Sequence, residues 1–141
     1  MPQTTRARRR KRFWNRLDNG TPASGTARMI KQRAVPEAGA PRTIMKPLTL
    51  VVMFQARPGK EAELRNVLAG LVAPTHKEKG CLNYDFHESA ESPGRFMFHE
   101  NWATKADHEA HFNSPHIQAL LPRIDELCAA FPQVTMWERA D

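Results

Sequence analysis

Long hydrophobic runs and cysteines are scarce in this chain, and each scarcity excludes a class of protein. No apolar run approaches the roughly 18 residues that a membrane-spanning helix needs, and no apolar segment follows the arginine-rich start as it would in a signal peptide. The two cysteines, Cys81 and Cys128, form no paired metal or redox motif and are too few for a disulfide framework. We therefore expect a soluble protein of the reducing cytoplasm.

Positive charge is concentrated in the first third of the 141-residue chain. Residues 1–46 contain twelve Lys or Arg and two acidic residues, hence +10, whereas residues 47–141 contain nine and thirteen, hence −4. The first segment also lacks sustained hydrophobic periodicity. We expect residues 1–46 to be a disordered basic extension and residues 47–141 to form one domain.

Aromatic residues interrupt the arginines of this extension. Phe13 and Trp14 lie among the basic residues 6–16, a composition that can grip phosphates and stack on bases. The plainer interpretation is a solvated arm, or a segment upstream of a start at Met45, and we favour it. A nucleic-acid partner is therefore not expected.

Hydrophobic periodicity begins at Leu48 and predicts a series of strands and helices. The run LTLVVMFQA is apolar on both faces, which is typical of a central strand. The next segment changes to helical spacing, with Pro74 expected to kink or end its helix early and Gly80 to stop it. The predicted elements are a strand at 48–56, a helix within 58–80, strands at 81–88 and 95–102, helices at 104–113 and 114–128, and a strand at 132–139.

This order, β-α-β-β-α-α-β, predicts a ferredoxin-like α+β fold. The helices of that fold cover one face of the sheet and leave the other face open. A first strand that is apolar on both faces should have its second face covered too, most simply by a second copy of the chain. The periodicity therefore predicts a homodimer that associates sheet to sheet.

The stretch from Arg95 to His116 contains four of the six histidines. His108 and His111 are three residues apart, one short of the zinc-protease spacing, so a metal site is not expected. His116 lies in the first turn of a predicted helix, where the helix dipole favours a neutral ring that can act as a general base. For His111 and His116 alike, a half-exposed structural role remains the alternative.

Strand alternation places Phe96, Phe98, Glu100 and Trp102 on one face of the predicted sheet. A carboxylate among aromatic rings is costly to bury in its ionised form. Glu100 is therefore either hydrogen-bonded structurally or has a raised pKa, and we favour the structural role. Trp102 is either core or the wall of a pocket, since a large aromatic side chain serves both.

Four segments, PGKEAELRNVL, GCLNYDFH, RFMFHENW and AHFNSPHIQALL, resemble in order and spacing the antibiotic biosynthesis monooxygenase family, especially its quinol monooxygenases. The resemblance covers residues 47–141. It implies a dimeric α/β barrel with a pocket in each subunit, and oxygenation of electron-rich phenols or quinols without flavin, haem or metal. It places the family's Glu-x-Trp pair on Glu100 and Trp102, its helix histidines on His111 and His116, and its strand tyrosine on Tyr84.

Three functions remain open at this point. The first is a cofactor-independent monooxygenase that acts on a hydroquinone or phenol with molecular oxygen, with His111 or His116 as base and Tyr84, Trp102 and Glu100 at the substrate. The second is an isomerase of a small phosphorylated metabolite, which is disfavoured because the stretch from Arg95 to His116 has no cluster of Lys/Arg and no glycine-rich phosphate loop. The third is a non-catalytic dimer that binds a small ligand.

Overall fold

Four antiparallel strands form the single sheet found in residues 46–141, the part of the chain that the computed structural model describes. The sheet has the strand order β2-β3-β1-β4, so that β1 lies in its interior. This order and the sequence of elements confirm the predicted ferredoxin-like fold. The strands are β1 (Leu48–Gln55), β2 (Cys81–Glu88), β3 (Arg95–Trp102) and β4 (Gln133–Trp137).

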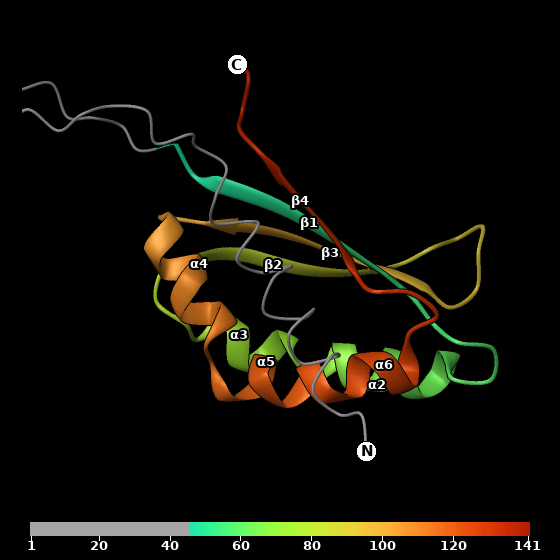
Figure 1. The fold of residues 1–141 in the computed structure, drawn as a ribbon. Coiled ribbons are helices and arrows are strands. Elements are labelled where there is room, and N and C mark those ends of the chain that lie inside the picture. Colours follow the sequence, from blue (N-terminus) through green and yellow to red (C-terminus); the bar gives the residue numbers. More distant parts are fainter. Residues whose placement is uncertain (1–45) are drawn as a thin grey trace, which may run out of the picture. The chain divides into compact units, whose positions relative to one another are not determined.

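The described helices lie in a layer against one face of the sheet (Figure 1). Two helices connect β1 to β2, and the others connect β3 to β4. The predicted extension at residues 1–46 lies outside the described residues except for Lys46. The helices are α2 (Glu61–Ala69), α3 (Val72–His76), α4 (Lys105–Phe112), α5 (Pro115–Leu120) and α6 (Ile124–Leu127), with a 3₁₀ turn η1 (Leu121–Arg123) between the last two.

The helix predicted between the first two strands is two helices in the structure. The helix predicted within residues 58–80 is interrupted at Gly70 and Leu71, and Pro74 lies inside α3. Pro74 was expected to kink or end the helix early, and the interruption lies one turn before it; Pro74 itself is the third residue of α3, where its missing N–H costs no hydrogen bond within that helix. Gly80, with φ +79°, does form the turn into β2.

A hydrophobic core fills the space between the sheet and the helices. The predicted alternation along β3 is confirmed, since Phe96, Phe98, Glu100 and Trp102 are all at most 2 % exposed. Burying each large apolar side chain stabilises the fold by about 1.5–3 kcal/mol. The core also includes buried aliphatic and aromatic side chains from β1 and the helices: Leu50, Phe54, Leu64, Leu68, Ile117, Leu120, Ile124 and Leu127.

No described helix covers the other face of the sheet (Figure 1). Alternation places Val51 and Met53 of β1 on this face, where they are only partly buried. Trp137 of β4 pairs with Thr49, lies on the same face and is 58 % exposed. An apolar face of this kind is what the predicted homodimer would cover, and the homodimer remains a prediction.

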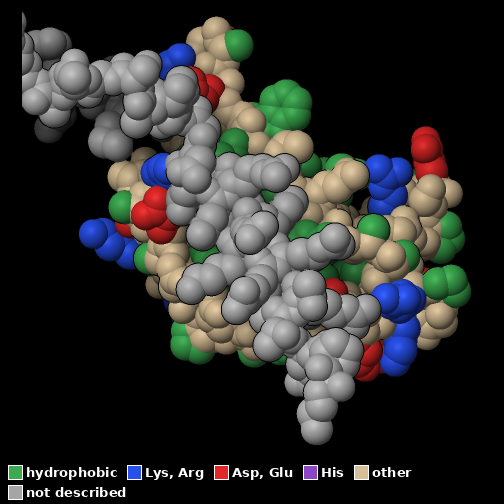
Figure 2. Space-filling view, in the orientation of Figure 1, with side chains coloured by type: hydrophobic (Ala, Val, Ile, Leu, Met, Phe, Trp, Pro, Cys, Tyr) green, Lys and Arg blue, Asp and Glu red, His purple; other side chains and the backbone are tan. Residues whose placement is uncertain are grey.

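Charges of both signs are interspersed elsewhere on the described surface (Figure 2). One pairing network joins helices α2 and α6 through Lys60, Glu63, Arg123 and Glu126. Exposed pairs of this type contribute little stability each. Within residues 46–141, no helix is long and apolar enough to cross a bilayer.

Candidate functional site

Glu78 lies against His111 and His116, although it precedes His111 by 33 residues in the sequence. Glu78 follows α3, His111 lies in the last turn of α4, and His116 is the second residue of α5. Nδ1 of His111 lies 2.5 Å from Oε2 of Glu78, and Nε2 of His116 lies 3.7 Å from Oε1 of the same carboxylate. Glu78 therefore bridges the two histidines.

Helix caps fix where these histidines lie. The Thr104 hydroxyl accepts a hydrogen bond from the backbone N–H of Asp107 and starts α4 two turns before His111. Pro115 then occupies the first position of α5. The Ser114 side chain does not cap this helix, and its Oγ lies 3.4 Å from Nε2 of His116.

A buried threonine links His116 to the sheet. Thr75 of α3 is fully buried, and its Oγ1 lies 3.0 Å from Nε2 of His116. Thr75 also interacts with Tyr84 of β2, whose pKa it lowers. Thr75, His116, Glu78 and His111 therefore form a chain of polar contacts, and Tyr84 lies beside its Thr75 end.

Aromatic rings enclose His111. Its ring centroid lies 4.6 Å from that of Trp102 and 5.3 Å from that of Tyr84. His108 lies one turn earlier on α4, and its ring is 6.1 Å from the His111 ring. The His111 side chain is only 5 % exposed, whereas Glu78 and His116 are 19 % and 21 % exposed. The cluster therefore meets solvent on the side of Glu78 and His116.

On β3, Glu100 accepts a hydrogen bond from the indole N–H of Trp102, with 2.7 Å between Nε1 and Oε2. The pKa of Glu100 is raised to about 7. Burial is the main cause, the charge of Glu78 adds to it, and the hydrogen bond from Trp102 opposes it. The sequence left open a structural role or a raised pKa for Glu100. The structure contains both features in one pair.

Burial also sets the protonation of the other members. It lowers the pKa of His111, while the hydrogen bond and charge of Glu78 oppose this change and the nearby His116 adds to it. Burial, together with the charges of Glu100 and Glu78, raises the pKa of Tyr84 well above its usual value. Near neutral pH the site therefore holds a neutral imidazole beside a neutral phenol.

The same cluster contains donor atoms suited to a metal ion. One ligand atom from each of Glu78, His111 and His116 lies within 4.8 Å of the other two. Two imidazoles and a carboxylate are a donor set that zinc and iron(II) accept. The sequence argument against metal considered the spacing of His108 and His111 and did not consider Glu78.

The structure brings together all five residues expected at the site. His111, His116, Tyr84 and Trp102 form one cluster, and Glu100 joins it through Trp102. Sequence reasoning missed Glu78 and Thr75. Glu78 lies in the segment THKEKG among other charged residues, and only its contact with a histidine 33 residues away distinguishes it.

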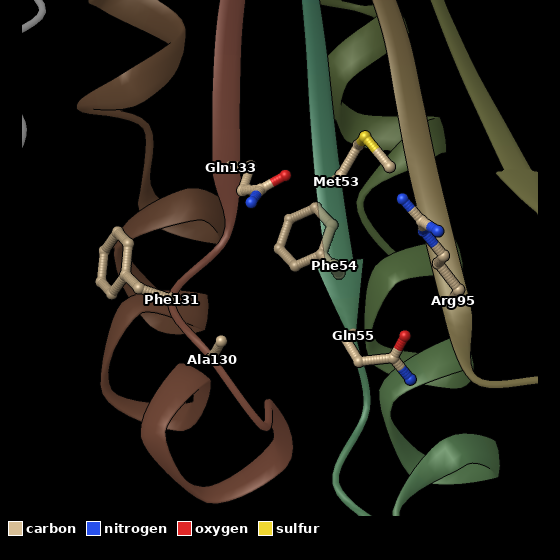
Figure 3. Close-up of a pocket in the computed structure, with 7 residues that line it drawn as sticks. All are labelled: Met53, Phe54, Gln55, Arg95, Ala130, Phe131 and Gln133. Atoms are coloured by element: carbon tan, nitrogen blue, oxygen red, sulfur yellow. The ribbon is translucent and has the colours of Figure 1, made fainter.

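A separate pocket of about 160 Å³ lies at the other end of β1 (Figure 3). Met53, Gln55, Arg95, Phe131 and Gln133 contribute to its lining. None of the histidine cluster contributes to it. We therefore base the candidate site on the polar cluster, where the perturbed titratable groups converge.

Comparisons with known proteins agree on one family. The model of the family described as "Antibiotic biosynthesis monooxygenase" matches residues 47–123. The protein named "Putative monooxygenase Rv0793" from Mycobacterium tuberculosis is 30% identical over 90 residues, which cover 64% of this chain and 88% of that protein.

Solved structures extend the likeness to the fold. The crystal structure of PA3566 from Pseudomonas aeruginosa is 31% identical, with a TM-score of 0.67, and the match covers 70% of this chain and 98% of that one. The structure of Rv0793 gives a TM-score of 0.64 at 29% identity, with 67% and 96% covered.

Proposed function

Because the chain belongs to the antibiotic biosynthesis monooxygenase family, we propose that it is a cofactor-independent monooxygenase that oxidises a hydroquinone or related phenol with molecular oxygen. The observation that supports this most is the buried contact of 2.5 Å between His111 and Glu78. A neutral histidine oriented by a carboxylate is the base that such a reaction needs.

The proposed reaction begins when the base removes a proton from a phenolic hydroxyl. The phenolate passes one electron to oxygen, and the phenoxyl and superoxide radicals combine at a ring carbon that carries a hydrogen to form a carbon–oxygen bond. The peroxide takes back the proton from the base, and loss of that carbon's hydrogen with cleavage of the oxygen–oxygen bond releases water and leaves a carbonyl on the ring. One oxygen atom enters the product and the other leaves as water, and the substrate supplies all the electrons. The protein provides a base and a partner for the developing negative charge.

We assign the base to His111 in preference to His116. When Nδ1–H of His111 donates to Glu78, the lone pair lies on Nε2, where it can accept a substrate proton. Glu78 then stabilises the imidazolium that forms. Nε2 of His116 is already within hydrogen-bonding distance of Thr75, so His116 acts in this scheme by holding Glu78 and Thr75 in place.

The remaining predicted site residues orient the reactants. Tyr84 stays protonated and can donate its hydroxyl to a phenolate oxygen. Trp102 packs against the His111 ring, and Glu100 fixes the Trp102 indole through its N–H. In this proposal Tyr84 contacts the substrate, and the Glu100–Trp102 pair supports the base.

The proposed assembly is a homodimer in the cytoplasm. The exposed sheet face carries apolar side chains such as Val51 and Met53, and Trp137 at its edge. The same face contains a ladder of polar side chains in which Asn101 donates to Asn83 over 2.5 Å. A second copy that covers this face would bury the apolar side chains and give the polar ladder a partner.

Oxygen uptake with a panel of reduced naphthoquinones and polyphenols tests the proposed activity. The wild type should consume oxygen with at least one member. His111→Ala should lower kcat by about 10²- to 10⁴-fold at neutral pH, with partial recovery at high pH where solvent deprotonates the substrate. His76→Ala, which changes an exposed histidine of α3, is the matched control and should keep full activity.

Two outcomes would contradict the proposal. A folded wild type that consumes no oxygen with any member of the panel would rule out the oxygenase function and favour an isomerase or a binding dimer. Full activity in His111→Ala would show that the base is a different residue.

A further inference from the structure

We propose that Glu78, His111 and His116 also form a reversible binding site for a divalent transition metal ion, best filled by zinc, and that metal binding inhibits the enzyme. Binding follows from the geometry of the three side chains alone. Inhibition rests on the proposed function, because it requires His111 to act as the base.

The separations of the ligand atoms suit a tetrahedral ion. Zinc bound at about 2.0–2.2 Å requires ligand atoms about 3.3 Å apart. Oε2 of Glu78 lies 2.5 Å from Nδ1 of His111 and Oε1 lies 3.7 Å from Nε2 of His116, and one ligand atom from each of the three residues lies within 4.8 Å of the other two, so modest side-chain rotations would bring them to that separation. A small rotation of the carboxylate would therefore let the metal replace the proton that Glu78 and His111 now share.

The donor atoms determine which metal ions the site prefers. Two imidazole nitrogens and one carboxylate oxygen favour zinc, cobalt(II) and iron(II), whereas magnesium and calcium prefer oxygen ligands alone. Three protein ligands leave a fourth position for water. The hydroxyl of Thr75 lies 3.0 Å from Nε2 of His116, so this contact would have to give way to the metal.

The surroundings of the cluster supply rigidity and access. The His111 ring is held against Trp102 with 4.6 Å between centroids, so this ligand is already oriented. Glu78 and His116 are 19 % and 21 % exposed, which gives a metal ion a route from solvent. A rigid inner ligand with more exposed outer ligands is consistent with reversible binding.

Inhibition follows from the chemistry of the imidazole ring. A neutral imidazole that binds metal through Nδ1 carries its proton on Nε2. Nε2 then has no lone pair for the substrate proton, and Glu78 no longer accepts from His111. Zinc at this site would therefore abolish the base without displacing the ring.

Isothermal titration of zinc sulfate into the chelator-treated full chain, prepared without a histidine tag, tests the site. We expect one zinc per chain, with binding weakened at least tenfold in Glu78→Gln and in His116→Ala. His76→Ala is the control and should bind like the wild type. Cobalt(II) should give the visible absorption of a tetrahedral nitrogen and oxygen site. Circular dichroism verifies that each variant is folded.

Folded wild type that takes up no zinc would overturn the site, as would equal affinity in His116→Ala and His76→Ala. Oxygen uptake measured with and without zinc tests inhibition separately. Saturation of the site without loss of oxygen uptake would contradict the inhibitory role. If no phenol supports oxygen uptake, the proposed function fails while the titration still decides the metal site.

Discussion

At the scale of single residues, the contact between Glu78 and His111 orients the imidazole and, in the proposed scheme, holds its proton on Nδ1. We predict that Glu78→Gln lowers kcat by about 10²-fold or more, because an amide stabilises the imidazolium less than a carboxylate does. KM should change little, since Glu78 does not contact the substrate in the proposed scheme. Oxygen uptake measures both constants.

The control for this substitution is Glu91→Gln, in the exposed loop between β2 and β3. It changes the same functional group and should leave kcat unaltered. An equal loss of activity in both variants would show that Glu78 has no special role.

Glu100 makes stability depend on pH. Burial raises its folded-state pKa from 4.5 to about 7, so its contribution to stability is greatest below pH 4.5 and is lost as pH rises through 7. A shift of this size corresponds to roughly 3 kcal/mol. We predict that Glu100→Gln, which cannot ionise, gains stability relative to the wild type by up to that amount between pH 4.5 and pH 8.

Urea unfolding of both proteins across this pH range measures the difference. A free-energy difference that stays constant with pH would show that Glu100 ionises normally in the folded protein.

At the scale of elements, Gly80 makes the turn that joins the segment containing Glu78 to β2. Its φ of +79° disfavours a side chain, and a Cβ there would lie 2.2 Å from Cγ of Asp107. We predict that Gly80→Ala destabilises the fold by about 1–3 kcal/mol. Thermal and urea unfolding measure this change.

Gly70 provides a matched comparison within the same connection. It has a helical φ of −64°, and the nearest atoms to an added Cβ are 3.4 Å and 3.5 Å away. Gly70→Ala should therefore be neutral or stabilising by up to about 1 kcal/mol. Equal effects of the two substitutions would contradict the role assigned to the turn at Gly80.

The elements themselves could largely be predicted from the sequence, because their signals are local. The alternation of β3 placed Phe96, Phe98, Glu100 and Trp102 correctly on the buried face. The break at Gly70 and Leu71 falls one turn before Pro74, as the missing N–H of proline favours, but its exact position was not predicted.

The site was predicted less completely because its decisive contacts are long-range. The histidines could be identified by their clustering, but Glu78 and Thr75 gain their roles from partners 33 and 41 residues away. No periodicity or short motif encodes such a contact.

At the scale of the whole molecule, all the predicted apolar periodicity lies beyond the basic N-terminal residues. We propose that residues 45–141 fold and dimerise alone, and we predict a melting temperature close to that of the full chain. Light scattering coupled to size exclusion gives the mass of both proteins, and calorimetry gives their melting. A truncated chain that aggregates, or a full-length chain that is monomeric, would contradict this proposal.

We propose that the site transfers one atom of molecular oxygen to a phenolic ring by means of His111. Mass spectrometry of the product formed under ¹⁸O₂ from an accepted reduced naphthoquinone tests it most directly. We expect one labelled atom per product molecule from the wild type and almost no product from His111→Ala. Product oxygen derived from water, or equal labelled product from both proteins, would contradict it.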